Sequence, residues 1–393
     1  MRSVLTLSAM SLVFFLITAT TFSSLGVVLP AMIGELHWNW SGAGSGFSLL
    51  GVAAGITATV PAIIIRKLGV RAALVLGSLV MAASFAFLTL THSLASYFLG
   101  ALLMGLGFTL LATVPGTYLL ARLFARPSLA FGVYFTVGGL GGVAGPVFYL
   151  WVMSLAHDWR AYWLAALVVV TAAGLLSVLV VDVKTDVSDR REKDPHITAK
   201  DWSARRAMRT PQFVVLAAAY SIFPFVGITV NAVAVAHLMR HGVGLTVAGG
   251  MMSLEALFNA SARLLGGVVV RWIPAKTLLL AALALMIAGL MALSAAHGTL
   301  LMILYALGVG VGYGLTFFAS TILLLDYFGR GPNLELFATV NLVSTVGAGG
   351  PAFAGFVADR AGSFAPAFAI LEGLVLLVLI AVAPMRPPRR RMA

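Results

Sequence analysis

The sequence predicts an all-α membrane protein of twelve transmembrane helices, arranged as two pseudo-symmetric bundles of six. Three observations support this prediction: the composition, the length of the apolar segments, and a repeat between the two halves. Of the 393 residues, 61% are hydrophobic and only 10% are charged, whereas soluble domains carry about 25% charged residues. Because a soluble fold cannot hide so much apolar surface, lipid must be the solvent for most of the chain.

The apolar segments are long enough to cross a bilayer, whose hydrocarbon core of about 30 Å requires about 20 helical residues. Glycine and proline occur inside the segments, which membrane helices tolerate. We interpret the first segment as a retained helix and not as a signal peptide, because its apolar run continues to Pro30 without a persuasive cleavage site. The predicted helices cover residues 6–33, 43–65, 71–91, 96–122, 128–155, 160–181, 212–238, 245–270, 276–296, 299–326, 334–358 and 364–384.

A single long polar stretch divides these segments into six and six. We therefore predict an N-terminal bundle over 1–181, a cytoplasmic central loop over 182–211, a C-terminal bundle over 212–384 and a basic cytoplasmic tail over 385–393.

The two halves also repeat, since a shift of 205 residues brings Arg66 onto Arg271 and Gly145 onto Gly350. An even number of spans in each half makes this a parallel repeat, and substrate sites in such proteins lie near the midplane between the halves.

Lysine and arginine predict the orientation, because cytoplasmic loops of membrane proteins are enriched in them. With both termini placed inside, the cytoplasmic segments hold 21 of the 25 basic residues. The outer loops hold Arg160, Arg240 and Arg360, and Arg263 lies inside a helix. We therefore expect a multi-pass protein of a bacterial-type inner membrane, with both termini in the cytoplasm.

Composition and motifs exclude several other functions. The absence of cysteine excludes disulfides, thiolate metal sites and a cysteine nucleophile. The net charge of +12 lies in short segments between apolar runs and not on a soluble face, so we expect no nucleic-acid partner. The sequence contains no P-loop and no metal-ligand cluster, and no catalytic serine set can be assembled inside the bilayer. We expect a protein that is not an enzyme and that binds no cofactor and no metal.

Several motifs resemble those of one transporter family. Over its full length the chain is similar to the major facilitator superfamily, and within it to the branch of monocarboxylate transporters and oxalate–formate carriers. The loop between helices 2 and 3 differs from the superfamily pattern, because Arg66 stands where an aspartate is usual. The motifs are AIIIRKLGVR (62–71), ARLFARPSLAFGVYFTVGGLGG (121–142), DWR (158–160), TPQF (210–213), SARLLGG (261–267) and DYFGR (326–330).

Arg263 is the main candidate for substrate binding. An arginine in the hydrocarbon region costs roughly 2.5–3.5 kcal/mol on insertion scales. It lies eight residues before Arg271, the inner end of helix 8, which places it roughly 12 Å into the membrane. Its repeat partner is Ala58, so the fold itself does not require a charge at this position. A guanidinium can bind a carboxylate through two parallel hydrogen bonds, and the resemblance implies that role. The alternative is an arginine that pairs with a backbone carbonyl of a neighbouring helix.

Asn259 and Glu255 precede Arg263 by one and two helical turns, so the three residues form one polar stripe. Asn259 is well placed to contact the arginine. Glu255 is the expected proton-coupling residue, because an apolar cleft favours the protonated form of a carboxyl group. The alternative for Glu255 is a hydrated side chain in the outer vestibule.

Three further residues are candidates for contact with the substrate. Asn341 stands where the oxalate carriers have a lysine, which disfavours a dicarboxylate and suits a hydroxyl or keto group; an interhelical hydrogen bond is the alternative. Tyr118 in helix 4 and Tyr313 in helix 10 carry phenols that can reach a substrate, or that simply pack between helices.

From these residues we expect a monomeric secondary transporter that carries a small organic anion, a monocarboxylate, by proton-coupled symport with alternating access. Its partners are the anion, a proton and membrane lipid. The alternatives within the class are a carboxylate exchanger and a drug-type efflux antiporter, since the GxxxGP pattern at Gly141–Pro146 resembles half of an antiporter motif. The alternative outside the class is a non-transporting membrane sensor.

Overall fold

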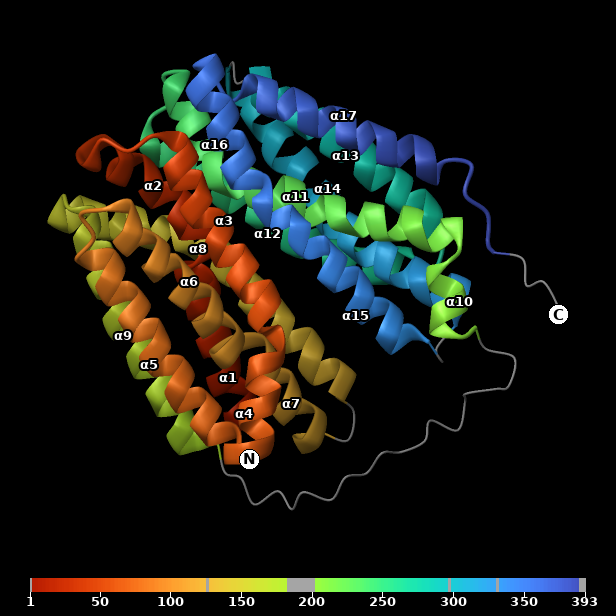
Figure 1. The fold of residues 1–393 in the computed structure, drawn as a ribbon, viewed down its shortest axis with the longest axis horizontal. Coiled ribbons are helices and arrows are strands. Elements are labelled where there is room, and N and C mark those ends of the chain that lie inside the picture. Colours follow the sequence, from red (N-terminus) through yellow and green to blue (C-terminus); the bar gives the residue numbers. More distant parts are fainter. Residues whose placement is uncertain (1, 125–126, 182–201, 296–297, 330–331, 389–393) are drawn as a thin grey trace.

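The structure is a computed structural model that describes residues 2–124, 127–181, 202–295, 298–329 and 332–388 (Figure 1). Most of the predicted central loop, residues 182–201, lies outside the described residues, and so does the predicted tail from residue 389 onward. The described part of the chain is helical and contains no strand, which confirms the predicted all-α class.

The described residues of the first half form nine α-helices, some of which join end to end within one membrane span. A 3-10 turn (Thr57–Thr59) joins α3 to α4, and a π turn (Thr109–Thr113) joins α6 to α7. The helices are α1 (Arg2–Thr20), α2 (Phe22–Leu36), α3 (Trp40–Ile56), α4 (Val60–Leu68), α5 (Val70–Thr89), α6 (Leu94–Phe108), α7 (Val114–Leu123), α8 (Pro127–Ala156) and α9 (Trp159–Val180).

The second half begins with a short helix that falls inside the predicted central loop and packs against α15. A 3-10 turn (Thr345–Gly349) joins α15 to α16. The helices are α10 (Ala204–Met208), α11 (Pro211–Arg240), α12 (Leu245–Val269), α13 (Ala275–Ala295), α14 (Gly298–Phe328), α15 (Asn333–Ser344), α16 (Gly350–Ala361) and α17 (Ala365–Val382).

Eleven spans in the described residues are long and apolar enough to cross a membrane. They correspond to eleven of the twelve predicted segments. The remaining segment, predicted over 245–270, is α12, which has 25 residues and sufficient length. Its mean hydropathy is lower because Glu255, Asn259 and Arg263 lie along it. The helix that departs most from lipid-like composition is therefore the one that carries the predicted polar stripe.

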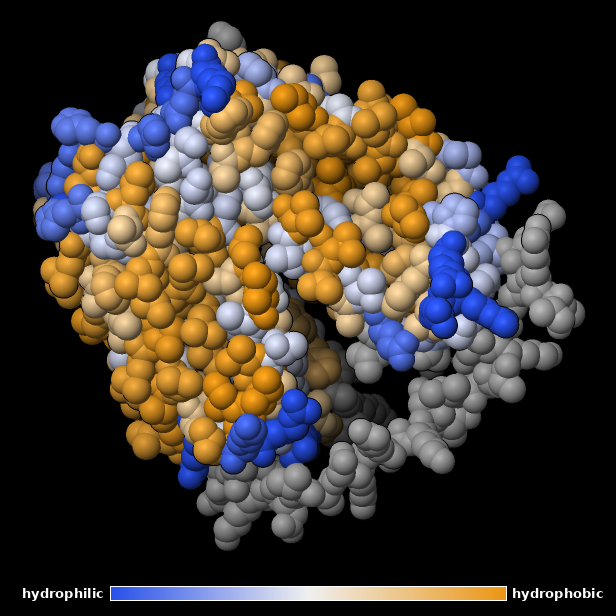
Figure 2. Space-filling model, in the orientation of Figure 1, coloured by the Kyte–Doolittle hydropathy of each residue, from blue (hydrophilic) through white to orange (hydrophobic). Residues whose placement is uncertain are grey.

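The flanks of the molecule are apolar, and the charged side chains gather at its two ends (Figure 2). Large apolar side chains are exposed along the outer helices, such as Leu79, Leu179 and Leu377. In water this surface would be unfavourable, whereas in hydrocarbon it costs nothing, since lipid tails are as apolar as leucine. The exposed apolar surface therefore supports a membrane location for the whole helical body.

The two halves meet closely at one end, which we call the closed end: the end where α2, α3, α11 and α16 come together, at the top of Figure 1. Asp359 of α16 accepts hydrogen bonds from the backbone N–H groups of Trp40 (2.9 Å) and Ser41 (2.7 Å), the first two residues of α3. Gly44 packs against the Pro351 carbonyl so tightly that a Cβ there would collide with it. The contact thus depends on small residues and on a carboxylate at a helix N-terminus.

At the opposite end, which we call the open end, the halves diverge. This end carries α4, α7, α10 and the N-terminus (Figure 1). The helices α4 and α7 pack mainly against elements of their own half. Figure 2 shows a hollow between the two halves on this side. The molecule is therefore closed at one end and open at the other, with the predicted polar stripe on a helix between them.

Candidate functional site

The polar stripe lies on α12 where this helix crosses α8 of the first half. The crossing is made by small residues: a Cβ at Gly142 would lie 3.4 Å from the Ala256 Cβ, and a Cβ at Gly139 would lie 3.8 Å from the Ala260 Cβ. Small residues let two membrane helices approach closely. Arg263 follows Ala260 by three residues, so it lies just beyond this crossing in the direction of the open end.

On its other side, α12 is fixed against α14 by two glycines spaced four residues apart. A Cβ at Gly310 would collide with the backbone carbonyl of Glu255, and a Cβ at Gly314 would collide with that of Asn259. Spacing of this kind is a common device for close helix packing in membranes. The backbone that carries the polar stripe is therefore held at a fixed distance from α14.

Arg263 is an exposed cation whose guanidinium lies against two aromatic rings of α14. The guanidinium carbon is 4.8 Å from the Phe317 ring centroid and 5.5 Å from the Tyr313 ring centroid. Contacts of this kind contribute about 0.5–1 kcal/mol at exposed sites. Among the described residues, Arg263 forms no ion pair with a carboxylate; the ion pairs found there join Arg160 to Glu35 and to Asp158. Its charge is thus supported by ring faces and not neutralised by an acid.

Glu255 is 3% exposed and lies on the same helix, two turns from Arg263 toward the closed end. Within the described part of the chain its carboxyl group forms no ion pair at 4 Å or less, so it does not neutralise Arg263 directly. The buried phenol of Tyr305 on α14 lies within electrostatic range of it. Between the two charges, the Asn259 Oδ1 atom is buried without a hydrogen-bond partner in the described structure. The predicted contact between Asn259 and the arginine is not made through this oxygen.

Asn341 on α15 is engaged by neighbouring protein groups. Its Oδ1 atom accepts a hydrogen bond from the Tyr220 hydroxyl of α11 at 3.0 Å, and its Nδ2 atom donates to the Phe337 carbonyl at 2.8 Å. The side chain is exposed on its remaining surface. Asn341 therefore makes the interhelical hydrogen bond that the sequence left open as the alternative to substrate contact.

The two candidate tyrosines differ in their surroundings. Tyr313 lies beside Arg263 and packs on Phe223 of α11, with 5.3 Å between the ring centroids. Tyr118 is on α7 in the other half, where the Arg122 guanidinium carbon lies 4.3 Å from its ring centroid. Tyr313 therefore lies beside Arg263, whereas Tyr118 contacts Arg122 in the other half of the molecule.

Several aromatic residues near Arg263 were not predicted as part of the site. Tyr220 and Phe223 of α11 and Phe317 of α14 pack on one another with ring centroids 4.9 to 5.8 Å apart. Tyr220 is buried and lies within electrostatic range of Arg263. The four-residue spacing of Tyr313 and Phe317 was a usable signal, because it puts both rings on one face of a helix. Nothing in the sequence indicated that α11 supplies the other rings.

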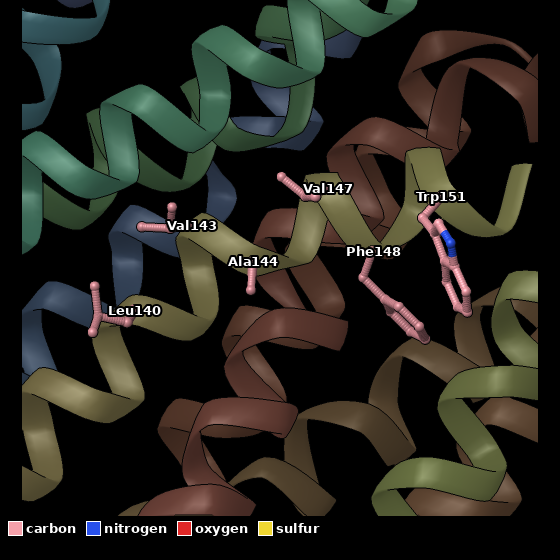
Figure 3. A pocket seen from close by; sticks show the side chains of 6 residues that line it. All are labelled: Leu140, Val143, Ala144, Val147, Phe148 and Trp151. Atoms are coloured by element: carbon pink, nitrogen blue, oxygen red, sulfur yellow. The ribbon is translucent and has the colours of Figure 1, made fainter. Parts of the chain in front are cut away.

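A second hollow lies along α8 (Figure 3). This open groove has a volume of about 400 Å³ and an apolar lining. None of the predicted site residues lines it, so it is not the candidate substrate site. No group of His, Asp or Glu side chains within the described ranges is arranged to hold a metal ion. The residues that line the groove are Leu140, Val143, Ala144, Val147, Phe148 and Trp151.

Comparison with known proteins agrees with this architecture. The chain matches the sequence model of the Major Facilitator Superfamily over residues 10–349. It belongs to this superfamily and is a membrane transporter of that type. A comparison with curated proteins finds no match.

Solved structures of transporters share the fold. The nucleoside transporter NupG is similar with a TM-score of 0.77 and 14% identity, covering 98% of this chain and 99% of that chain. A peptide transporter POT in complex with sulfate has a TM-score of 0.74 and 14% identity, covering 96% and 94%. A bacterial homologue of the human lysosomal transporter Spinster, inward-facing and unoccupied, has a TM-score of 0.71 and 15% identity, covering 98% and 95%. At these identities the likeness extends to the fold alone.

Proposed function

We propose that this member of the major facilitator superfamily transports a small monocarboxylate, which binds Arg263 through its carboxylate. The observation that supports this function is an exposed guanidinium next to the crossing between the two halves, without a carboxylate partner among the described residues. The resemblance of SARLLGG and of the α8 motif to the monocarboxylate and oxalate–formate branch points in the same direction.

The unfavourable free energy of a guanidinium in the membrane interior explains why an anion would bind to Arg263. Placing a guanidinium in the membrane interior is unfavourable by roughly 2.5–3.5 kcal/mol or more. Two cation–π contacts offset part of this cost, at about 0.5–1 kcal/mol each. A carboxylate that forms two charge-assisted hydrogen bonds would offset the rest and would neutralise the site. Substrate binding would therefore favour the closing of the two halves around it.

Glu255 is the residue that we assign to proton coupling. Its carboxyl group is buried on the same helix as Arg263 and is not paired with it at 4 Å or less. Charges two helical turns apart influence each other in a low-dielectric interior. When an anion neutralises Arg263, the positive field that favours ionised Glu255 disappears, and a proton is taken up. Anion binding and protonation are then reciprocally linked.

The basic residues give the orientation of this cycle. Arg66, Lys67 and Arg205 lie at the open end, whereas Asp359 and Glu35 lie at the other end. By the enrichment of lysine and arginine in cytoplasmic segments, the open end faces the cytoplasm of a bacterial-type cell. In that orientation, the open end would be the cytoplasmic opening of the inward-facing state of an alternating-access cycle.

The first test is a thermal-shift screen of the purified protein against mono- and dicarboxylates, because a ligand that binds only the native state stabilises it by mass action. Monocarboxylates should raise the melting temperature of the wild type but not of Arg263→Ala. Oxalate should have no effect, since one fixed cation cannot match two carboxylates. Stabilisation by oxalate that persists in Arg263→Ala would contradict the proposed site.

Transport in proteoliposomes tests the proton. Glu255→Gln should lose accumulation driven by an inward proton gradient and should keep exchange of labelled for unlabelled substrate. Glu335→Gln, on the exposed surface of α15, is the matched control and should accumulate substrate normally. Full accumulation in Glu255→Gln would show that the coupling proton is carried by another residue. Exchange without gradient-driven accumulation in the wild type itself would favour carboxylate exchange, the alternative within the class.

A further inference from the structure

Phe135 on α8 lies opposite Arg263 across the space between the halves, as the register of the crossing indicates. Gly142 meets Ala256, and Gly139 meets Ala260, so residue numbers fall along α8 as they rise along α12. One turn beyond Gly139 on the same stripe of α8 is Phe135. The corresponding position on α12, one turn beyond Ala260, is that of Arg263.

The Phe135 ring is supported from one side and open on the other. Its centroid lies 6.0 Å from that of Phe14 and 5.5 Å from that of Tyr134. Both of these residues are buried, while Phe135 itself is 45% exposed. Because almost half of its surface is exposed, the ring keeps a face free for a further contact. The first half therefore offers an aromatic face at the level of the arginine.

The second half offers matching faces. The rings of Phe223, Tyr313 and Phe317 are packed together beside the guanidinium and are each partly exposed. The nearby amide of Asn341 already accepts from Tyr220 and donates to a backbone carbonyl. The space around Arg263 is thus bounded by aromatic rings on both sides, and the polar groups beside the guanidinium include the Tyr313 hydroxyl and the Asn259 amide.

We propose that the transported monocarboxylate carries an aromatic ring, as benzoate and phenylacetate do, and that Phe135 is the residue that selects it. This inference rests on the proposed function of Arg263. The carboxylate lies on the guanidinium, and the ring lies between Phe135 and the rings of Phe317 and Phe223. Aromatic pairs prefer edge-to-face or offset arrangements with centroids 4.5–7 Å apart, and these add attraction beyond the burial of area. Small hydroxy acids such as lactate would leave the aromatic faces uncovered.

The test compares four probes on the purified wild type: benzoate, cyclohexanecarboxylate, acetate and lactate. Cyclohexanecarboxylate matches benzoate in size and charge but has no π system. Benzoate should bind about tenfold more tightly than cyclohexanecarboxylate, and more tightly still than acetate. Phe135→Leu should remove the preference for benzoate and leave acetate binding unchanged. Phe87→Leu, an exposed phenylalanine on α5 away from the crossing, is the control and should behave as the wild type.

The outcomes separate this inference from the proposed function. If no carboxylate binds, the proposed function fails and the inference fails with it. If acetate or lactate binds as tightly as benzoate, or cyclohexanecarboxylate equals it, the carboxylate site stands and the aromatic selection is overturned. Should Phe135→Leu not fold, as judged by its melting temperature, Phe135→Met provides the same comparison of benzoate with acetate. An unchanged ratio in either folded variant contradicts the proposal.

Discussion

Among the helix crossings that join the described halves of this transporter, two are related to each other by the repeat in the sequence. In one, α3 of the first half packs against α16 of the second. In the other, α12 of the second half packs against α8 of the first. Because the repeat aligns α3 with the first part of α12, and α8 with α15 and α16 together, the two pairs of helices occupy equivalent positions in the fold. Their chemistry has nevertheless diverged.

The α3–α16 crossing closes one end of the molecule. It combines Gly44 and Gly355, each in contact with a backbone carbonyl of the other helix, with the Asp359 carboxylate at the first turn of α3. The α8–α12 crossing instead sets Gly142 and Gly139 against the Cβ atoms of Ala256 and Ala260, and Arg263 lies just beyond them. At the positions equivalent to Glu255, Asn259 and Arg263, the first half has leucine and two alanines. The α3–α16 crossing therefore closes one end of the molecule, whereas the α8–α12 crossing places a cation between the halves, although both depend on small residues.

The largest expected effect concerns the charge at the α8–α12 crossing. Arg263→Lys keeps the charge but loses the planar fork, and the loss of one or two charge-assisted hydrogen bonds should reduce uptake by about 100-fold. Uptake in proteoliposomes at equal protein content measures this. Arg271→Lys, two residues beyond the end of the same helix, should transport normally. Normal uptake by Arg263→Lys would mean that the carboxylate is not held in a bidentate manner.

The second prediction concerns the α3–α16 crossing at the closed end. Gly44→Leu places a large side chain against the Pro351 carbonyl, and such overpacking should favour separation of the closed end by about 2 kcal/mol, or about 30-fold. The chain contains no cysteine, so a single Ser48→Cys probe in this buried interface reports opening by its rate of thiol labelling. Labelling should rise and uptake should fall. Unchanged labelling would show that α3 and α16 do not control access at this end.

A smaller change in the ratio of closed to separated states is expected when the Asp359 carboxylate at the closed end is replaced. Asp359→Asn keeps the shape and loses the charge that strengthens two hydrogen bonds to α3, at about 1.5 kcal/mol or about tenfold in the ratio of closed to separated states. The same Ser48→Cys labelling measures it. Asp158→Asn is the matched control, because Asp158 accepts from the backbone N–H of Arg160 within one half. If both variants label alike, Asp359 contributes to folding and not to the choice of conformation.

The smallest expected effect concerns the hydrogen bond between α11 and α15. Tyr220→Phe removes the hydroxyl that donates to Asn341 and keeps the ring, so substrate affinity should change by about threefold, from about 0.7 kcal/mol. The direction distinguishes two roles. Weaker binding would show that this hydrogen bond holds the aromatic rings of α11 and α14 in place beside Arg263. Stronger binding of lactate would show that a freed Asn341 amide can recognise a hydroxyl. No change for any probe would remove Tyr220 and Asn341 from the site.

The sequence alone determined the membrane-spanning architecture and the polar stripe of α12. A run of about 20 apolar residues has only one stable form in hydrocarbon, since every backbone polar group must be satisfied within the segment. Arg263 and Glu255 were recognisable for the same reason, because a charge in such a segment is costly and stands out against its apolar neighbours. The helical period then places them on one face without further information.

Tertiary structure alone decided which residues surround the polar stripe of α12 and which residues hold the two halves together at the closed end. Tyr220, Phe223 and Phe135 are apolar or aromatic residues in apolar helices, where the sequence gives no contrast that could single them out. Asp359 lies near the end of a helix, where charged residues are ordinary, and its partners are 318 and 319 positions away in the chain. Helix–helix packing in a membrane depends on shape and close approach and not on a hydrophobic pattern, so such pairings appear only when the halves are assembled.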